Sequence, residues 1–447
     1  MITFLRNAFE ANIDNDALVW QNQVYKYNDL LTALDYWSSH LENAKVGPNQ
    51  VVALEADFSP NALALMLALI DRRCVIVPLS STVASQKNEF CRIAEVEQII
   101  SVNADDEVNI IVTNQSVINP LNQKLKELKH PGLILFSSGS TGKSKAALHD
   151  FVPLLEKFKI PRKTLRTLAF LLFDHIGGIN TLFYTLANGG CAVTLKERSP
   201  EAVCKAIQDH KVELLPTSPT FINLLLLSEV WKNFDLSSLK LVTYGTEVMP
   251  PATLQRFHNL FPNIKLQQTY GLSEIGILSS KSRSPDSLWV KIGGSGITYR
   301  IVDGILHIKT PSAMLGYLNA QSPFTEDGWF DTGDQVEVDG EYIKILGRKS
   351  EIINVGGEKV WPVEIENVLL TMSGVEDVAV TGRANPITGQ MVQARVKLST
   401  DESLSDFRKR MRQYCKDKMP AYKIPQQVIL ENEGFHGGRF KKIRRQI

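Results

Sequence analysis

Cysteine is scarce in this chain of 447 residues, and neither sign of charge is in excess. The five cysteines are scattered, and no pair has C-x-x-C spacing. This excludes a disulfide framework or a cysteine zinc site and predicts free thiols in a reducing compartment, the cytoplasm. The 49 Lys and Arg residues against 48 Asp and Glu residues give a net charge of +1. That balance provides no long-range field for a polyanion, so we expect no nucleic-acid partner.

Long hydrophobic runs are also missing. The N-terminus lacks a basic region followed by an apolar stretch, which predicts no secretion signal. The most apolar segment, Leu63–Leu69, is soon followed by Asp71, Arg72 and Arg73, so we expect no membrane span. The composition, 44% apolar and 22% charged, is typical of a soluble globular protein, and the length suggests two or three units.

Up to about residue 320, short β-branched runs such as Val51–Ala56 and Cys74–Pro78 alternate with longer helical patterns. This alternation predicts an α/β fold in which a large, multi-sheet N-terminal domain has layered α/β structure. After Gly347 the pattern changes to that of a compact α+β module. We therefore expect a large domain at residues 1–349 and a small, mobile C-terminal domain at residues 350–447.

The pattern also predicts individual elements. In the large domain the expected strands are Leu133–Ser137, Leu168–Leu172, Cys191–Leu195, Leu214–Pro216 and Leu241–Tyr244. In the small domain we expect helices Val363–Thr371 and Leu404–Lys418 and strands Val375–Thr381, Met391–Leu398 and Gln427–Leu430.

A loop of small hydroxyl residues and glycines follows the predicted strand Leu133–Ser137, and two lysines close it. Its candidate ligand-binding residues are Ser137, Ser138, Gly139, Ser140, Thr141, Gly142 and Lys145. Such a loop presents N–H groups, hydroxyls and positive charge to phosphate oxygens. It is not a Walker A loop, because that motif needs a glycine where Ser137 stands. The alternative interpretation is a flexible surface turn.

From Phe136 to Lys145 this loop resembles the phosphate loop of the adenylate-forming (AMP-binding) enzymes. That superfamily comprises acyl- and aryl-CoA ligases, peptide-synthetase adenylation domains and luciferases. Ser144 replaces its usual proline. The resemblance implies that the loop holds the β- and γ-phosphates of ATP.

The segment Thr269–Glu274 resembles the family's Tyr-Gly-x-Thr-Glu motif. The resemblance implies a nucleotide site built from Thr269, Tyr270 and Gly271, with Tyr270 packed on adenine. It places Ser273 near the α-phosphate and makes Glu274 a ligand of Mg²⁺, which suits a carboxylate together with phosphate oxygens.

Other segments resemble the walls of the nucleotide pocket. Tyr244–Glu247 is similar to one side of the adenine pocket, which implies roles for Gly245, Thr246 and Glu247. Gly328–Asp334 is similar to a segment whose final Asp accepts hydrogen bonds from the ribose hydroxyls, a role that implies Asp334. Arg348 would also contact the ribose.

The segment Gly347–Glu366 resembles the family's hinge and the start of its C-terminal domain, with Ser350 where Asp or Lys is usual. Gly356 and Gly357 resemble the glycine loop of thioester-forming relatives. This implies packing on the pantetheine arm of CoA or of a carrier protein after the domain rotates. Without the resemblance, the glycine pair indicates only a hairpin turn.

The C-terminus is similar to the family's mobile-lysine motif, Gly-Lys-x-x-Arg, with more than one possible register. Lys441 with Arg444 keeps the Lys-to-Arg spacing, as does Lys442 with Arg445, and Arg439 directly follows the glycine. We expect Lys441 to be the catalytic lysine and keep Lys442 and Arg439 as alternatives. The simplest alternative is a solvated basic tail.

The segment Phe173–Gly178 resembles the His-x-x-Gly motif of CoA ligases, which implies that His175 lies at the mouth of the acid pocket. A frame shifted by two residues would make Phe173–Asp174 the amino-group clamp of amino-acid-activating domains. Thr217–Phe221 and Ile275–Gly276 are expected to complete a largely apolar cavity.

Together the motifs imply an ATP- and Mg²⁺-dependent ligase. It would join a small carboxylic acid to AMP and pass the acyl group to CoA or to the phosphopantetheine of an acyl carrier protein. One alternative is an amino-acid-activating enzyme that loads a carrier protein. Another is a non-catalytic nucleotide-binding relative, suggested by Ser144, Ser350, Asn354 and the altered C-terminal motif. The acid, the choice of thiol and the oligomeric state are left open.

Overall fold

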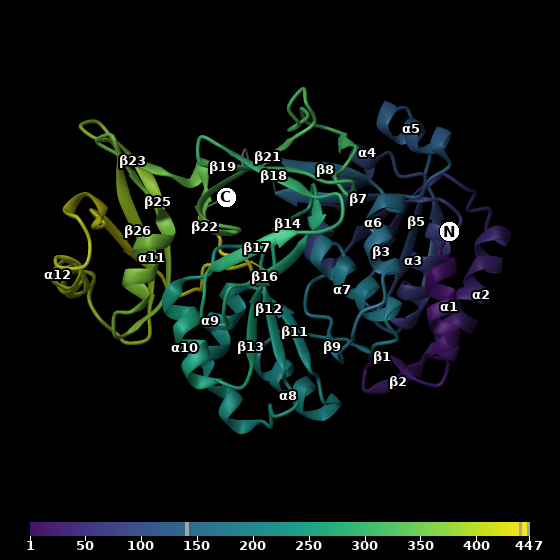
Figure 1. Cartoon of the computed structure of the whole chain (residues 1–447), viewed down its shortest axis with the longest axis horizontal. Helices are drawn as coiled ribbons and strands as arrows, with labels where there is room; N and C mark the ends of the chain where they lie inside the picture. Colours follow the sequence, from purple (N-terminus) through teal and green to yellow (C-terminus); the bar gives the residue numbers. More distant parts are fainter. Residues whose placement is uncertain (139–142, 438–439, 445–447) are drawn as a thin grey trace.

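The computed structural model describes residues 1–138, 143–437 and 440–444. It confirms the predicted fold class, a large multi-sheet α/β part followed by a small α+β module (Figure 1). Two seven-stranded sheets and one six-stranded sheet belong to the large part, and a five-stranded sheet belongs to the module.

The first seven-stranded sheet has the order β13-β12-β11-β9-β10-β1-β2. The β1–β2 pair is antiparallel, and the other pairs that the structure describes in this sheet are parallel. The strands are β1 (Asp16–Trp20), β2 (Gln23–Lys26), β9 (Thr167–Leu168), β10 (Ala192–Val193), β11 (Leu214–Thr217), β12 (Leu241–Tyr244) and β13 (Lys265–Gln268).

The second seven-stranded sheet has the order β20-β8-β7-β4-β3-β5-β6, and its four central strands are parallel. The strands are β3 (Val51–Glu55), β4 (Val75–Leu79), β5 (Gln98–Val102), β6 (Val108–Val112), β7 (Gly132–Ser138), β8 (Ser144–Asp150) and β20 (Gly316–Tyr317). The glycine-rich loop of the sequence connects the antiparallel pair β7 and β8.

The third sheet is antiparallel, with the order β16-β17-β22-β21-β19-β18. Its strands are β16 (Ser279–Ser282), β17 (Trp289–Gly293), β18 (Thr298–Val302), β19 (Ile305–Lys309), β21 (Phe330–Asp339) and β22 (Tyr342–Arg348). A short hairpin of β14 (Gly271–Leu272) and β15 (Gly276–Ile277) precedes it.

Ten α-helices and three 3₁₀ turns lie in the described part of the chain before the module. They are α1 (Thr3–Ala11), α2 (Tyr27–Asn43), α3 (Pro60–Asp71), η1 (Ser81–Gln86), α4 (Lys87–Ala94), α5 (Pro120–Leu128), α6 (Phe151–Glu156), η2 (Lys157–Lys159), α7 (Ile176–Ala187), α8 (Pro200–His210), α9 (Pro219–Ser228), η3 (Val230–Asn233) and α10 (Pro251–Leu260).

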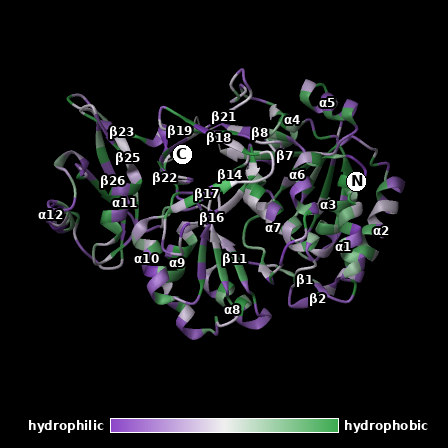
Figure 2. Cartoon of the chain, in the orientation of Figure 1, coloured by the Kyte–Doolittle hydropathy of each residue, from purple (hydrophilic) through white to green (hydrophobic). Residues whose placement is uncertain are grey.

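Helix α3 is apolar along almost its whole length, and it lies in the main core beside α1 and α2. Every residue from Ala62 to Ile70 is buried, and Figure 2 shows α3 as a continuous hydrophobic element. Ser59 caps its N-terminus by accepting the N–H of Ala62. None of the helices in the described segments combines the length and apolar character that a membrane crossing requires.

The C-terminal module has its own apolar core and is linked to β22 by the turn η4 (Lys349–Glu351). Its elements are β23 (Ile353–Val355), β24 (Glu358–Val360), α11 (Pro362–Leu370), β25 (Val375–Asn385), β26 (Gly389–Leu398), α12 (Leu404–Cys415), η5 (Ala421–Lys423) and β27 (Gln427–Leu430). After β27 the chain runs back from the module toward the large part (Figure 1).

Two predicted strands of the large domain are wrong in extent. The prediction Leu168–Leu172 corresponds to the two-residue β9, and Cys191–Leu195 to the two-residue β10. Phe170, just beyond β9, packs on Phe221 with ring centroids 4.4 Å apart. Burial of this apolar run therefore comes from side-chain packing, which needs no strand pairing.

Candidate active site

One cavity of about 2050 Å³ lies where the large part meets the module. Many predicted site residues line it, although they come from distant segments: Ser137, His175, Gly245, Thr246, Thr269, Gly271, Ser273, Glu274, Arg348 and Lys441. Single small-molecule pockets measure roughly 300–1000 Å³, so this cavity can hold a nucleotide and a second substrate together.

One side of the cavity forms at the carboxyl ends of the parallel strands β11, β12 and β13, where α/β sheets commonly bind ligands. Gly245 and Thr246 follow β12, and Thr269 follows β13. A Cβ atom at Gly245 would lie 2.6 Å from Thr269 Oγ1. Glycine is therefore required where these two strand ends come together.

The buried residues Tyr270 and Asp334 and the partly exposed Arg348 form a cluster beneath this side. The Tyr270 hydroxyl donates to Asp334 Oδ2 at 2.7 Å, and Arg348 Nε lies 2.7 Å from Asp334 Oδ1. Burial raises the pKa of Asp334, although the Arg348 charge opposes this shift. Burial and Asp334 raise the pKa of Tyr270, so the phenol keeps its proton and donates. Asp334 is thus an oriented acceptor beside the cavity.

Glu274 is held from two sides on the turn between β14 and β15. The Tyr317 hydroxyl donates to Glu274 Oε1 at 2.7 Å, and the Met314 N–H donates to the Glu274 carbonyl at 2.7 Å. Burial and the nearby Glu274 charge raise the pKa of Tyr317, so this phenol also remains a donor. Behind the turn, the buried His149 contacts the Ser273 carbonyl through Nε2. The carboxylate therefore has a fixed place in the wall.

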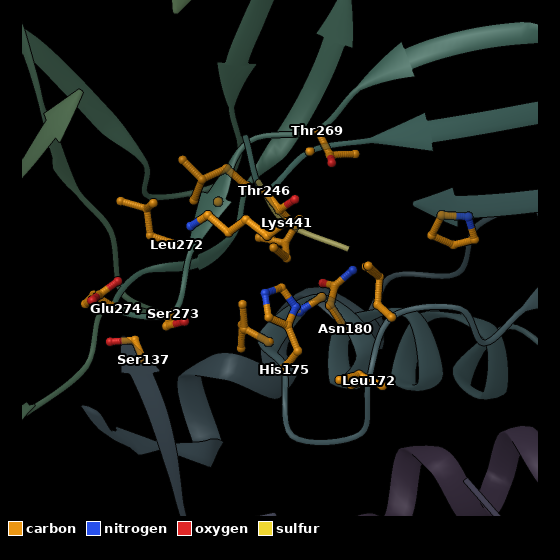
Figure 3. Close-up of a pocket in the computed structure, with 18 of the residues that line it drawn as sticks. Ser137, Leu172, His175, Asn180, Thr246, Thr269, Leu272, Ser273, Glu274 and Lys441 are labelled. Carbon is orange, nitrogen blue, oxygen red and sulfur yellow. The ribbon is translucent and has the colours of Figure 1, made fainter. Parts of the chain in front are cut away.

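His175 forms the N-cap of α7 and points into the cavity (Figure 3). Its Nδ1 accepts the N–H of Gly177 at 3.0 Å. Because Nδ1 is an acceptor, the neutral ring carries its proton on Nε2. Gly178 packs against the preceding backbone, since a Cβ there would lie 2.0 Å from the Leu172 carbonyl oxygen. This contact accounts for a glycine in the His-x-x-Gly motif.

The segment before the C-terminus crosses from the module into the large part and carries Lys441 into the cavity. The Phe440 ring packs on Phe170 and Phe221, with centroids 5.3 and 5.4 Å apart. The Ser218 hydroxyl donates to the Phe440 carbonyl at 2.6 Å. Figure 3 shows the Lys441 side chain extended in the cavity above His175. Burial and the Arg348 charge lower the pKa of Lys441.

The next residue, Lys442, points into the module. Its ammonium donates to the Val378 carbonyl at 2.8 Å and lies 3.2 Å from Asp377 Oδ1. Successive side chains of an extended segment point to opposite sides, which explains why the two lysines separate. The arrangement directs Lys441 into the cavity and makes Lys442 an anchor of the tail, although Lys442 also lines part of the cavity.

Other predicted site residues lie outside the cavity wall. Lys145 lies over the Tyr317 ring, 5.1 Å from its centroid. Glu247 accepts N–H groups from Thr220 and Lys442, at 2.8 and 3.0 Å, and so joins the large part to the tail. Gly356 and Gly357 form the turn between β23 and β24, both with positive φ.

Some predictions fall on residues that the structure does not describe. Ser138 ends β7, opposite Ser144, without a described side chain. Outside the described residues lie Gly139, Ser140, Thr141, Gly142, Gly438, Arg439 and Arg445.

The alternative amino-group clamp, Phe173–Asp174, is in the core. Phe173 is fully buried and packs edge-on against Phe58, with ring centroids 5.3 Å apart. Asp174 accepts the Ser80 hydroxyl at 2.8 Å. Neither residue lines the cavity, so the shifted frame provides no carboxylate there for an amino acid's ammonium group.

Sequence reasoning missed three polar residues at the site: Lys157, Asn180 and Tyr317. Lys157 and Asn180 line the cavity, and Tyr317 orients Glu274. The motifs contain none of them. Of the three, Asn180 alone could have been found from the sequence. It lies three residues after Gly177 of the His-x-x-Gly motif in α7, and residues three apart share one face of a helix.

The chain matches two sequence profiles that describe known domains. The profile described as AMP-binding enzyme matches residues 5–318. The profile described as AMP-binding enzyme C-terminal domain matches residues 364–433.

Known proteins agree with these matches. The chain is 29% identical to an indoleacetate–CoA ligase of Aromatoleum aromaticum over 333 residues, which are 68% of this chain but 64% of that protein, less than two thirds. It is 24% identical to a 2-succinylbenzoate–CoA ligase of Enterococcus faecalis, with 96% of this chain and 94% of that protein covered.

A solved structure, the anthranilate CoA ligase AuaEII in complex with anthranoyl-AMP, has a similar fold. Its TM-score is 0.83 at 19% identity, and the match covers 99% of this chain and 95% of that chain. The family is shown by the first profile, which spans most of the large part, together with the second profile in the module. This chain belongs to the AMP-binding enzyme family.

Proposed function

We propose that this chain is an ATP-dependent acid–thiol ligase that forms an acyl-AMP and then an acyl thioester. The observation that carries the proposal is the position of Lys441, which a C-terminal segment brings into the same cavity as His175, Glu274 and Arg348. A cavity that only bound nucleotide would not need a cation delivered from a separate module.

In the first step, an oxygen of the acid's carboxylate attacks the α-phosphorus of ATP. The bond from that phosphorus to the pyrophosphate oxygen breaks, which leaves acyl-AMP and pyrophosphate. Both reactants are anions, so the step needs positioning and positive charge more than proton transfer. In this proposal Lys441 and Arg348 supply that charge at the cavity wall. Asp334, which is paired with Arg348, would accept the ribose hydroxyls.

In the second step, the sulfur of a thiol bonds to the acyl carbon, the bond from that carbon to the AMP phosphate oxygen breaks, and AMP and the thiol proton are released. We propose CoA or the phosphopantetheine of a carrier protein as the thiol, with Gly356 and Gly357 contacting its arm. In the structure the glycine turn lies away from the cavity wall while Lys441 occupies it. Thiol transfer therefore requires rotation of residues 350–447 against residues 1–349 about η4.

The wall also fits a magnesium ion bound together with ATP. Mg²⁺ commonly uses one or two carboxylates plus phosphate oxygens. Within the described segments no three His, Cys, Asp or Glu side chains form a metal cluster of their own, and Glu274 is a carboxylate already oriented at the cavity. Mg²⁺ held there would neutralise phosphate charge.

Glu274→Gln should weaken Mg²⁺ dependence specifically. The amide keeps an oxygen for the Tyr317 hydroxyl but loses the negative charge that attracts the ion. We expect the Mg²⁺ concentration for half-maximal activity to rise about 10- to 100-fold, measured by Mg²⁺ titration of pyrophosphate exchange. Tyr317→Phe is the control, because it keeps the carboxylate. An equal rise in both variants would contradict a metal role for Glu274.

The proposal is tested by ATP–pyrophosphate exchange with a panel of carboxylic and amino acids, followed by thioester assays with CoA and with a carrier protein. Exchange with free carboxylic acids and acyl transfer to a thiol is the expected result. Exchange with amino acids alone would favour the amino-acid-activating alternative. ATP binding without exchange for any acid would overturn the proposal and indicate a non-catalytic relative.

A further inference from the structure

A partly buried ammonium group lies in the wall of the cavity on the α7 side. Lys157 begins η2, and its Nζ donates to Asn180 Oδ1 at 2.5 Å and to the Ile277 carbonyl at 2.8 Å. Asn180 belongs to α7 and Ile277 to β15, and both residues line the same cavity as Lys157. This lysine therefore lies between two walls of the proposed acid pocket.

The surroundings of Lys157 neutralise its charge poorly. An ammonium has three N–H donors, and the two partners described for it here are a neutral amide and a carbonyl. The neighbouring Glu156, exposed at the surface, instead pairs with Lys159. Burial and the positive charge of Arg162 lower the pKa of Lys157 to about 8. A buried cation without a carboxylate partner gains stability when a ligand brings an acceptor oxygen.

The position of this ammonium along α7 fits the far end of an acid. His175 caps α7, and Asn180, which binds Lys157, lies five residues further along the helix. At 1.5 Å per residue this is about 7.5 Å along the helix axis, comparable with a benzene ring that bears substituents at both ends. Figure 3 shows His175 and Asn180 directed into the cavity from one helix.

Several apolar side chains line the cavity together with this ammonium. Leu172, Ile176 and Ile277 line the same cavity, and Phe158 lies under the ammonium with its ring centroid 4.9 Å from Nζ. A saturated or unsubstituted acid would leave the ammonium facing hydrocarbon. An acid with an oxygen at its far end would bind it.

We propose that the acid substrate carries a second oxygen acceptor, a carboxylate or a phenolic oxygen, at the end remote from the activated carboxylate, and that Lys157 selects it. This inference rests on the proposed function and names its substrate class. Lys157 is a specificity residue, because it contacts the far end of the acid and not the reacting atoms.

The test compares benzoate, 4-hydroxybenzoate and benzene-1,4-dicarboxylate, and the cinnamate series with and without a 4-hydroxyl. Pyrophosphate exchange gives kcat/KM for wild type, Lys157→Met and the control Lys159→Met. We expect wild type to prefer acids with the distal oxygen about 10- to 100-fold. Lys157→Met should lose this preference through KM, and Lys159→Met should keep it. A preference for the dicarboxylate would identify the distal acceptor as a carboxylate, and a preference for the phenol would identify it as a phenolic oxygen.

A purely structural role for Lys157 would give a different result, since its loss would lower kcat/KM equally for all acids and would overturn the inference. Equal kcat/KM for all acids in wild type would overturn it as well, while leaving the ligase proposal intact. Calorimetric binding of the same acids provides a readout that needs no turnover. If no acid supports exchange, the ligase proposal fails, but a distal-oxygen preference in binding that Lys157→Met removes would still support the inference. If Lys157→Met fails to fold, Lys157→Gln replaces it.

Discussion

Replacing Lys441 by alanine should lower pyrophosphate exchange about 10²- to 10³-fold, the loss typical when one preorganised charged or donor group is removed from a transition state. Lys441 is the lysine whose side chain extends in the cavity, where burial and the positive charge of Arg348 lower its pKa. The charges of Glu247 and Glu351 oppose this shift, and the positive charge that Lys441 carries in the cavity is available to the acid and the α-phosphate. The exchange assay measures only the adenylation step.

Lys442→Ala provides the matched control because it removes the same charge from the adjacent position. Its ammonium binds the Val378 carbonyl and Asp377 inside the module. We expect this variant to unfold at a lower temperature, since it leaves the buried Asp377 without its cation. Lys441→Ala should melt close to wild type and should still transfer a preformed acyl-AMP to the thiol. Loss of exchange in Lys442→Ala with normal exchange in Lys441→Ala would reverse the assignment.

The sequence alone could not choose between these lysines, and the reason is local geometry. Lys441 and Lys442 are each followed by an arginine three positions later, so spacing leaves two solutions. The choice depends on which side chain faces the large part. That orientation is determined by the Phe440 ring between Phe170 and Phe221 and by the bond from Ser218 to the Phe440 carbonyl. These partners lie more than 200 residues away, and no motif connects them.

Fold class, by contrast, was predictable because it depends on short-range patterns. Strand β12 was predicted with its bounds at Leu241–Tyr244, and β27 with its bounds at Gln427–Leu430. The antiparallel sheet of β16–β19, β21 and β22 was not predicted. Its strands carry charged and polar residues on their open face, as in the alternating burial of β21, so no continuous apolar run marks them.

The motifs predicted cavity residues well where the chain must turn at a strand end, as at Gly245 and Thr269. They did not reveal Lys157. Its importance comes from contacts with Asn180 on one helix and the Ile277 carbonyl on a hairpin. A lysine at the start of a short 3₁₀ turn has no pattern that separates it from a surface lysine.

Glu366→Gln should produce the largest loss of stability, about 3–5 kcal/mol in the module, because it removes one partner of a buried ion network. Glu366 is 1% exposed. Its carboxylate accepts from Arg444 through two N–H groups, each at 2.9 Å, and from the Val380 N–H at 3.0 Å. Burial alone would raise the pKa of Glu366, but Arg444, Lys442 and the Val380 N–H together lower it.

The sign of the pH dependence follows from this lowered pKa. A carboxyl whose native pKa lies below its unfolded value contributes stability above the unfolded pKa. That contribution is lost as the pH falls from the usual glutamate range through the native pKa. Wild type should therefore lose module stability over this acid range, while Glu366→Gln should show a flatter profile. Native-state hydrogen exchange of the β25 amides measures the local opening free energy.

Glu364→Gln is the matched control, since Glu364 lies on the same helix, α11, but is half exposed and pairs with Lys423 at the surface. It should cost less than about 1 kcal/mol. Arg444 lies three residues after Lys441, so release of Arg444 from Glu366 also frees the tail that holds Lys441 in the cavity. Glu366→Gln should therefore lower pyrophosphate exchange together with β25 protection. If the β25 amides are equally protected from hydrogen exchange in Glu366→Gln and Glu364→Gln, the buried network does not anchor the tail. Pyrophosphate exchange should then remain at the wild-type rate.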